Sequence, residues 1–428
     1  MSGSAPADAL TAPASAAEAT GHRRAFSRVL PAVVTAVAIV ALGPYFAWGT
    51  PLYFRGFIGL LAILFLLSAS AGVLTISRRD LSLAALCVLL LTYFAAHRRG
   101  GIYDPSSGWL ALVLFVLLPD RLKSSSFRCF AWVFALSLLP AMIVWILSSA
   151  GVDVPWSYLY AKRLDDDFLL GTGGSYYRHY LGSVVRSGVL WTFPSGSTLF
   201  RLHGMYEEPG VVGTVAGLLL AAGRFQFKGR AENVILLVGG VMSLSLAFFA
   251  ILYLSLLWRH PAITVMLTAL AVTVVLAIDL PTRVPAVRFI LFNRLTIRGD
   301  AVVGDNRVTP LFGALYDAFW RADLRTRLLG SPSDITSVVN TGAFSFKVLI
   351  YQYGLLGFAG LLAVLSSALL AISRQRDALI LLAIMLLSIY QRPNVMTLPY
   401  IIILLGGAAS LEVSRRGRPA AAVAPAAA

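Results

Sequence analysis

Runs of apolar residues, broken by short polar or charged connections, make up most of the chain. A run of about 20 apolar residues is long enough to cross the hydrocarbon core of a bilayer as one helix. The pattern therefore predicts an all-α polytopic integral membrane protein. We place spans over about 30–49, 56–76, 81–97, 108–119, 130–149, 208–223, 262–280, 346–371, 378–391 and 397–412.

The apolar stretch 232–257 is too long for one ordinary span, because a helix of that length would reach about 39 Å. It crosses the membrane either once or twice, and the positive-inside rule separates the two cases. A double crossing, with a break near Gly239 and Gly240 or at Ser243, returns Arg259 and the basic C-terminal residues to the side of the basic N-terminus. We therefore predict about 12 transmembrane helices, with the N- and C-termini cytoplasmic.

The same topology defines the organisation of the chain. The composition of 1–29 and of 413–428, rich in alanine and proline, predicts disordered cytoplasmic tails. Between them, 30–412 forms a single membrane domain. Two hydrophilic stretches, about 150–207 and 281–345, fall on the outer side as large periplasmic loops. Loops of this length in a compact protein are usually functional.

Composition narrows the class of protein. Hydrophobic residues make up 58% of the chain and charged residues 13%, whereas a soluble domain has about 25% charged residues. Two cysteines and five histidines argue against a disulfide framework, a metal centre or a haem enzyme, so we expect neither metal nor cofactor. The net charge of +15 comes almost wholly from arginine, and a basic total in a membrane protein indicates no nucleic-acid partner. The predicted spans hold almost no charge at mid-membrane depth, which argues against an ion-coupled carrier.

The second outer loop is rich in arginine. A guanidinium group donates two parallel hydrogen bonds to phosphate oxygens and stays charged at any physiological pH. A cluster of such groups near the membrane surface fits a phosphate-bearing lipid head group. The alternative is that these arginines pair with the aspartates of the loop or with anionic membrane lipids. The eight arginines are Arg283, Arg288, Arg294, Arg298, Arg307, Arg321, Arg325 and Arg327.

An arginine, a histidine and two glutamates stand just before the sixth predicted span, in the segment 201–210. Pro209 suits the first turn of a helix, so Glu208 should lie at or beside the N-cap, where the helix dipole favours the ionised carboxylate. Such a group can serve as the general base for a sugar hydroxyl. The alternative is a surface cap residue. His203 could orient a substrate, although a lone histidine in a loop is more often only solvated.

The pattern Arg201-x-x-Gly-x-x-x-Glu208-Pro-Gly resembles a segment of the O-antigen polymerase and ligase superfamily, which includes Wzy-type polymerases and lipid A-core O-antigen ligases. Three further stretches resemble that family in the same order along the chain, so the resemblance covers about 201–360. They are the Ser-rich break after Gly239-Gly240, the stretch from Arg307 to Gly330, and Asn340-Thr-Gly-Ala-Phe followed by Tyr353-Gly-Leu-Leu-Gly357.

The resemblance implies a membrane glycosyltransferase of the bacterial inner (cytoplasmic) membrane, with its active site on the periplasmic face. Its substrates would be undecaprenyl-diphosphate-linked glycans, and it would use no metal. By position, Arg201 and Arg307 would contact the diphosphate, and Glu208, or Glu207 in its place, would act in the catalytic centre. Further residues expected to bind the diphosphate or the substrate are Arg288, Arg294, Arg298, His203, Tyr206 and Asn340.

Two departures from the ligase pattern favour a polymerase. Ser243 and Ser245 are followed by leucine where ligases commonly carry arginine, and Asn340 stands where they carry histidine. An asparagine cannot accept a proton at neutral pH. We therefore expect a polymerase of lipid-linked oligosaccharide repeat units for a surface polysaccharide or exopolysaccharide. A ligase that transfers glycan to lipid A-core or protein, and a carrier or flippase for lipid-linked sugar, are the alternatives. Expected partners are membrane lipids, a chain-length regulator and export proteins.

Overall fold

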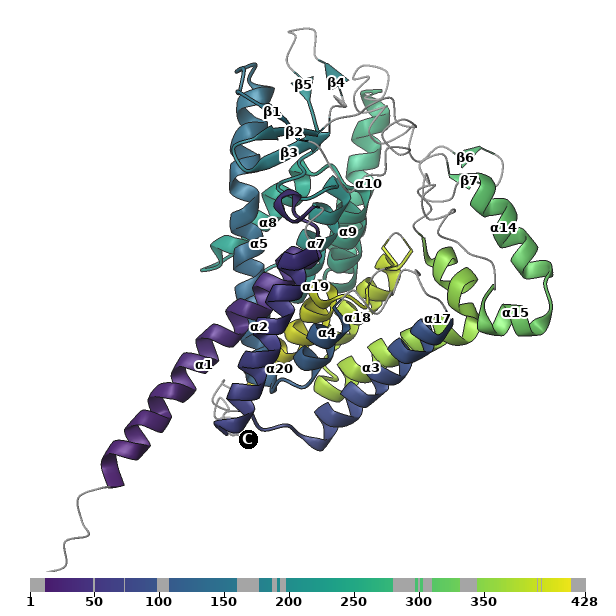
Figure 1. The fold of residues 1–428 in the computed structure, drawn as a ribbon. Helices are drawn as coiled ribbons and strands as arrows, with labels where there is room; N and C mark the ends of the chain where they lie inside the picture. The colour runs from purple at the N-terminus through teal and green to yellow at the C-terminus, as the bar shows by residue number, and fades with distance from the viewer. Residues whose placement is uncertain are drawn as a thin grey trace, which may run out of the picture.

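Helices dominate the computed structural model of the chain, and five long apolar stretches of helix could each cross a membrane (Figure 1). They lie in α2 (Pro51–Ser70), α3 (Arg78–His97), α5 (Asp120–Ser149), α17 (Phe346–Ile372), and the run from α19 (Leu398–Ile401) through the π-helical η3 (Ile402–Gly406) to α20 (Gly407–Arg416). The structure describes residues 12–48, 51–72, 74–97, 108–159, 177–186, 191–192, 198–279, 297–298, 301–302, 310–331, 345–390, 392–393 and 395–416.

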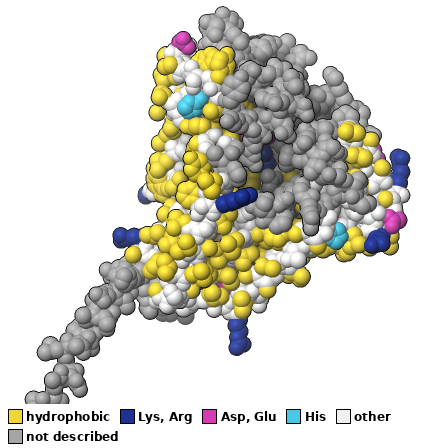
Figure 2. Space-filling model, in the orientation of Figure 1, with side chains coloured by type: hydrophobic (Ala, Val, Ile, Leu, Met, Phe, Trp, Pro, Cys, Tyr) yellow, Lys and Arg dark blue, Asp and Glu magenta, His cyan; other side chains and the backbone are white. Residues whose placement is uncertain are grey.

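Apolar side chains cover much of the outside of the described bundle, as Figure 2 shows for one face. On α10 (Pro261–Ala277), for example, Leu267, Leu270 and Leu276 are all more than half exposed. Soluble proteins rarely expose apolar surface of this extent, whereas membrane lipid can cover it. The described residues thus form a mostly helical protein with candidate membrane spans, as predicted. The number of spans and their sidedness stay predictions.

The helix α7 (Pro209–Ala222) lies in the middle of the bundle and is buried along almost its whole length. It packs against α8 (Ala231–Met242), α9 (Leu246–Arg259) and α18 (Arg376–Ser388). Glycines make this close packing possible. A Cβ atom built on Gly217 would lie only 3.1 Å from Ile251 Cγ2 of α9. Larger residues would push the helices around α7 apart.

The helix α8 runs antiparallel to α7, and α9 runs parallel to it. At the break between them, the backbone N–H of Leu202 donates to the carbonyl of Met242 at 3.1 Å, close to the start of α7. At the end of α9, Arg259 Nη2 donates to the carbonyl of Ala221 at 3.1 Å, at the end of α7. The start of α8 lies at that same end, because Asn233 donates to the backbone that follows α7. The predicted pair of short helices that meet at a Gly/Ser break is therefore confirmed.

The N-terminal tail differs from the prediction. The helix α1 (Ala12–Ala41) begins inside 1–29, which we expected to be disordered. Alanine has the highest helix propensity of all residues, so the Ala-rich sequence continues the helix of the first predicted span in the N-terminal direction. At the other end of the chain, α20 extends to Arg416, four residues into the tail predicted over 413–428. The residues after it lie outside the described part.

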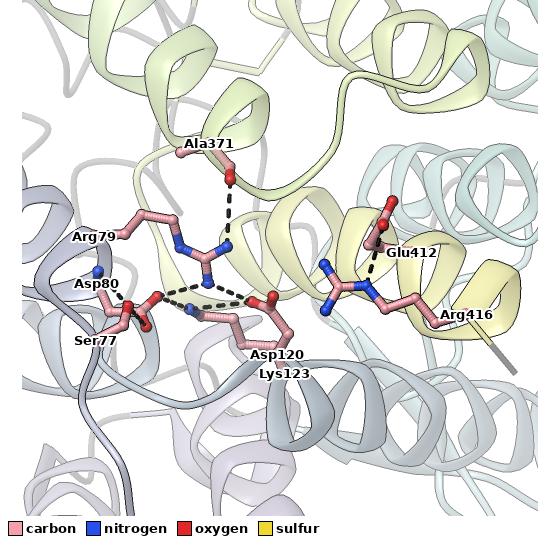
Figure 3. Close-up of polar contacts among 8 residues, drawn as sticks. All are labelled: Ser77, Arg79, Asp80, Asp120, Lys123, Ala371, Glu412 and Arg416. Atoms are coloured by element: carbon pink, nitrogen blue, oxygen red, sulfur yellow. Dashed lines mark hydrogen bonds and ion pairs between the residues drawn. The ribbon is translucent and has the colours of Figure 1, made fainter.

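Two predicted spans have different lengths in the structure. The helix α4 (Trp109–Val116) has 8 residues, and a helix of this size covers about 12 Å, too little to cross a bilayer alone. By contrast, α5 already begins at Asp120, in a stretch that we assigned to a polar connection. The helix can begin this early because Lys123, although fully buried, forms an ion pair with Asp80 of α3. Its Nζ lies 2.8 Å from Asp80 Oδ1 (Figure 3). A paired charge can be accommodated inside a helix bundle where a lone one could not.

Small antiparallel sheets occupy parts of the two outer loops, where the all-α prediction placed no strands. β1 (Ser157–Leu159), β2 (Tyr177–Tyr180) and β3 (Ser183–Arg186) form one sheet in that order. Leu181 and Gly182 both have positive φ, which is typical of the tight turn of a hairpin. The sheet packs on the end of α5 through a cluster that includes Val144 and Val185. Two further strand pairs are β4 (Trp191–Thr192) with β5 (Thr198–Leu199) and β6 (Ile297–Arg298) with β7 (Ala301–Val302).

The second outer loop also contains two helices, α14 (Pro310–Arg321) and α15 (Leu324–Leu329), which stand beside α17 in Figure 1. Asp323 caps α15, because its Oδ1 accepts a hydrogen bond from the backbone N–H of Thr326 at 3.3 Å. The neighbouring α17 is kinked at Gly354, where φ is 67°. The end of α15 packs at this kink.

Candidate active site

The segment that precedes α7 is held against the break between α8 and α9. Arg201 Nε donates to the carbonyl of Ser243 at 3.1 Å, directly beside the backbone hydrogen bond from Leu202 to Met242. Carbonyls at a helix end lack partners within their own helix. The two donors therefore supply hydrogen bonds to carbonyls at the end of α8 that the helix itself leaves without a partner. The guanidinium of Arg201, which we expected at the diphosphate, is therefore anchored at the start of the candidate site.

The Ser-rich break has a packing role in the structure. Ser243 and Ser245 are both buried, and Ser243 Oγ donates to the carbonyl of Gly240 at 2.6 Å. Leu244 between them has a φ of 48°, which is rare for a side chain of this type. A Cβ atom on Gly213 of α7 would lie 2.7 Å from Ser245 Oγ. The small residues thus let the first turns of α7 approach the break.

Glu208 lies at the N-cap of α7, as the sequence predicted, and forms an ion pair with Arg392. Its backbone is extended, and Pro209 occupies the first turn. Arg392 Nη2 donates to Glu208 Oε2 at 2.6 Å, and the side chain of Arg392 is 12% exposed, while that of Glu208 is 45% exposed. Gly210 makes room for the pair, because a Cβ there would collide with the Arg392 guanidinium.

The pair joins a carboxylate, which can accept a proton, to a guanidinium group, which can bind an anion. The positive end of the α7 dipole and the arginine both favour the ionised form of the Glu208 carboxylate. Arg392 comes from the connection between α18 and α19, and the hydrogen bond from its backbone N–H to the carbonyl of Ser388 at 2.8 Å holds it at the end of α18. A carboxylate that is nearly half exposed can meet a substrate hydroxyl, and the arginine beside it can meet an anion.

His203 and Glu207 lie next to this pair in the same segment. His203 is 7% exposed, so it is a buried residue rather than the solvated one that a lone loop histidine usually is. Its Nδ1 lies 3.2 Å from the carbonyl oxygen of Glu207. The hydroxyl of Tyr177 in β2 donates to the same carbonyl at 3.3 Å. These contacts fix the backbone just before Glu208, which orients the carboxylate.

Tyr206 does not lie where we predicted. We expected it to contact the substrate, but its side chain is fully buried under the site. Its ring stacks on Phe134 of α5 with centroids 5.2 Å apart, and its hydroxyl is 3.0 Å from Ser137 Oγ. Burial raises the pKa of the phenol above its ordinary value, and the hydrogen bond with Ser137 lowers it by less. Tyr206 therefore stays neutral and joins the segment to α5.

Most residues of the second outer loop that we predicted at the diphosphate cannot be placed relative to the site, because they lie outside the described part of the chain. Four of the predicted residues, Arg288, Arg294, Arg307 and Asn340, lie outside the described residues. Arg298 lies in β6, and its side chain also lies outside the described part. Their roles at a diphosphate stay predictions.

Sequence reasoning missed Arg392. In the predicted topology Arg392 lies on a short outer connection, between the spans 378–391 and 397–412, where the positive-inside rule disfavours arginine. That exception was the available signal, because an arginine on the unfavoured side needs another reason to be there. Within the described ranges, no group of three or more His, Cys, Asp or Glu side chains could hold a metal ion.

Comparisons with protein-family models, with curated proteins and with solved structures find no match for this chain.

Proposed function

We propose that the protein is a membrane glycosyltransferase that polymerises undecaprenyl-diphosphate-linked oligosaccharide repeat units for a surface polysaccharide or exopolysaccharide. The growing glycan would pass from its lipid diphosphate to a hydroxyl of the incoming lipid-linked unit, on the periplasmic face of the bacterial inner membrane. The family resemblance of 201–360 suggests this activity. The observation that carries the proposal is the ion pair of Glu208 and Arg392 at the start of α7, in a segment that also holds the anchored Arg201.

The proposed reaction forms one bond and breaks another at C1 of the donor sugar. The acceptor hydroxyl oxygen attacks C1 while the bond from C1 to the diphosphate oxygen breaks. Glu208 takes the proton of the hydroxyl, and the diphosphate leaves with the negative charge. Arginines that face the leaving group stabilise it more as its charge grows, which lowers the barrier. Arg392 is the described arginine best placed for this role, because it already contacts the base.

The surroundings of the pair favour such chemistry. Ser137, the α5 partner of Tyr206, is followed by 12 residues of the same helix, and those residues rise about 18 Å. The sheet β1–β2–β3 packs on this outer part of α5. The outer part of α5 and its sheet therefore extend past the level at which Tyr206 meets α5, where a glycan could pack against them.

Two alternatives remain to be separated from polymerisation. A ligase would use the same donor and the same pair but a different acceptor, lipid A-core or protein. A carrier would need charged or polar groups along a path through the membrane. In the five candidate spans, the charged residues lie toward the helix ends, which favours an enzyme over a carrier.

The test uses purified protein in lipid with lipid-linked repeat units, and it reads product length on a gel. Glu208→Gln keeps the shape of the side chain but cannot take a proton, so chain extension should fall by about 10²–10⁴-fold. The matched control is Glu232→Gln, which alters another glutamate near an arginine, at the far end of α7. That variant should extend chains normally when its level in the membrane equals that of the wild type.

Three outcomes would contradict the proposal in different ways. Full ladders from Glu208→Gln would remove Glu208 as the base and direct attention to Glu207. Transfer of one finished glycan to an added acceptor, without ladders, would indicate a ligase. Movement of lipid-linked sugar between leaflets, without any transfer, would indicate a carrier.

A further inference from the structure

A cavity of about 320 Å³ lies at the end of α7 that is remote from Glu208. The helix has 14 residues, so about 21 Å separate the cavity from the candidate active site. Sites for small molecules usually have volumes of about 300–1,000 Å³. The charged and polar residues on which its chemistry depends come from three separate parts of the chain: Arg224, Arg230, Gln375, Ser410, Ser414 and Arg415.

A chain of contacts links two of the three lining arginines, Arg224 and Arg415. Arg224 Nη2 donates to Gln375 Oε1 at 3.3 Å, and Gln375 Nε2 donates to Glu412 Oε2 at 2.8 Å. Glu412 Oε1 accepts a hydrogen bond from Arg415 Nη2 at 2.8 Å. On its other side, Arg224 Nε lies 2.8 Å from Asp377 Oδ2. Side chains that are fixed before a ligand arrives lose little conformational entropy when it binds.

The backbone at Arg224 is also unusual. Arg224 and Phe225 have φ values of 59° and 52°, in the left-handed region that these residues seldom adopt. Such conformations persist where the surrounding structure determines them, and they are frequent at functional sites. Here the turn brings Arg224 from the end of α7 to Gln375 before α18, so it closes one side of the cavity.

Positive charge exceeds negative charge around the cavity. Its lining, within the described part of the chain, contains three arginines and no acidic residue. Behind the lining, Glu232 pairs with Arg230 at 3.5 Å. The other two carboxylates are each shared between two arginines, so neither balances its neighbours fully. The contacts join Arg224 and Arg259 to Asp377, and Arg415 and Arg416 to Glu412 (Figure 3 shows Arg416 with Glu412). An arginine carries five N–H donors, so donors remain for an anion.

We propose that this cavity binds a phosphate group, carried either by the head group of an anionic lipid or by a soluble phosphate compound. Several arginines that converge on a polar cavity are suited to phosphate oxygens, which accept paired, charge-assisted hydrogen bonds. Basic pockets between membrane helices bind anionic head groups on the cytoplasmic side, and the charge pattern predicts that this end of the bundle is cytoplasmic. The site is separate from the proposed catalytic pair and does not depend on its chemistry.

The experiment compares two double variants of the full chain. Arg230→Gln/Arg415→Gln removes two charges from the lining and keeps Arg224, which pairs with Asp377. The matched control, Lys228→Gln/Arg416→Gln, removes the same charge at the same end from residues that do not line the cavity. The thermal midpoint of purified protein in neutral detergent is followed in two titrations. One adds phosphatidylglycerol against phosphatidylcholine, and the other adds inorganic phosphate against chloride at constant ionic strength.

A ligand that binds the folded protein raises its thermal midpoint. The wild type and the control should respond to at least one phosphate source, and the lining variant should need about tenfold more of it for the same shift. A response to the lipid alone assigns the site to a head group, and a response to inorganic phosphate alone assigns it to a soluble ligand. The proposal is overturned if the wild type responds to neither, or if the two double variants respond alike, because general surface charge would then explain the effect.

Discussion

Gly330 and Gly354 lie backbone to backbone, and this contact attaches the second outer loop to the membrane bundle. A Cβ atom built on Gly330 would lie 3.0 Å from the Gly354 nitrogen, and one built on Gly354 would lie 2.5 Å from the Gly330 nitrogen. Beside them, the N–H of Ser331 donates to the carbonyl of Tyr351 at 2.8 Å. Gly330 ends α15 and Gly354 lies in α17, so the contact joins two separate helices.

This contact predicts that Gly354→Ala destabilises the protein. At a φ of 67° and a ψ of −178°, a conformation essentially restricted to glycine, a Cβ costs about 1–3 kcal/mol, and the added atom would also collide with the carbonyl of Leu328. The thermal midpoint of the purified protein should fall clearly. The matched control is Gly59→Ala in α2, where a Cβ meets nothing within 4 Å. Equal midpoints for the two variants would show that the loop does not depend on the glycine contact.

The buried pair of Lys123 and Asp80 predicts a second stability effect. Lys123→Met leaves the carboxylate of Asp80 without its closest charged partner inside the bundle, and breaking a buried ion pair costs about 3–5 kcal/mol. The contacts of Asp80 with Arg79 and Ser77 remain (Figure 3), so the lower end of that range is expected. The thermal midpoint in detergent measures the loss, with Lys228→Met as the exposed control.

The double variant Asp80→Asn/Lys123→Met distinguishes a charge effect from a packing effect. Removal of both charges leaves no uncompensated ion, so the midpoint should return most of the way to that of the wild type. If the double variant is as unstable as Lys123→Met alone, the loss does not come from an unpaired Asp80 charge, and the ion pair does not explain how α3 is held against α5.

Local signals predicted much of the fold and one half of the candidate catalytic pair. Apolar runs mark the helices because the thickness of the membrane sets their length. Pro209 marks the start of α7 because only the first turn of a helix tolerates proline well. Glu208 therefore lies at the N-cap where the sequence placed it. The break between α8 and α9 was also predictable, because one helix over 232–257 would leave basic residues on the wrong side.

Contacts between distant parts of the chain could not be read in this way. Arg392 meets Glu208 across 184 residues, and no periodicity links the two. Tyr206 stands beside charged residues in the sequence, but its ring packs on Phe134 in the core. The short strands were missed because each is too brief to show the alternation of polar and apolar residues that marks a strand.

The arrangement of α7, α8 and α9 sharpens the prediction of topology. Arg376 Nη2 donates to the carbonyl of Trp258 at 3.0 Å, so Arg376 lies at the end of α9, as does the connection that contains Lys228. Cysteines introduced at Lys228 and Arg376 should both resist a membrane-impermeant thiol reagent in intact cells. Cysteines at Asp166 and Arg298 should react with it.

The labelling is done after the native Cys87 and Cys129 are replaced by alanine, and lysed cells show that each site can react. Labelling at Arg376 but not at Lys228 in intact cells would contradict the packing of α8 and α9 on α7. Labelling at both, with Arg298 silent, would keep that packing and invert the predicted orientation.

The last prediction concerns the coupling between Glu208 and Arg392. If the two act as one unit, Arg392→Gln should also slow chain extension, because it removes the cation that contacts both the base and the leaving group. The double variant with Glu208→Gln should then be less impaired than the sum of the two single losses, by about 0.5–3 kcal/mol of activation free energy. Initial rates of extension, measured for all four proteins at saturating donor, give this coupling directly. Lys228→Gln, which removes an exposed charge at the other end of α7, should leave the rate unchanged. Strictly additive losses would mean that Arg392 and Glu208 act independently rather than as one unit.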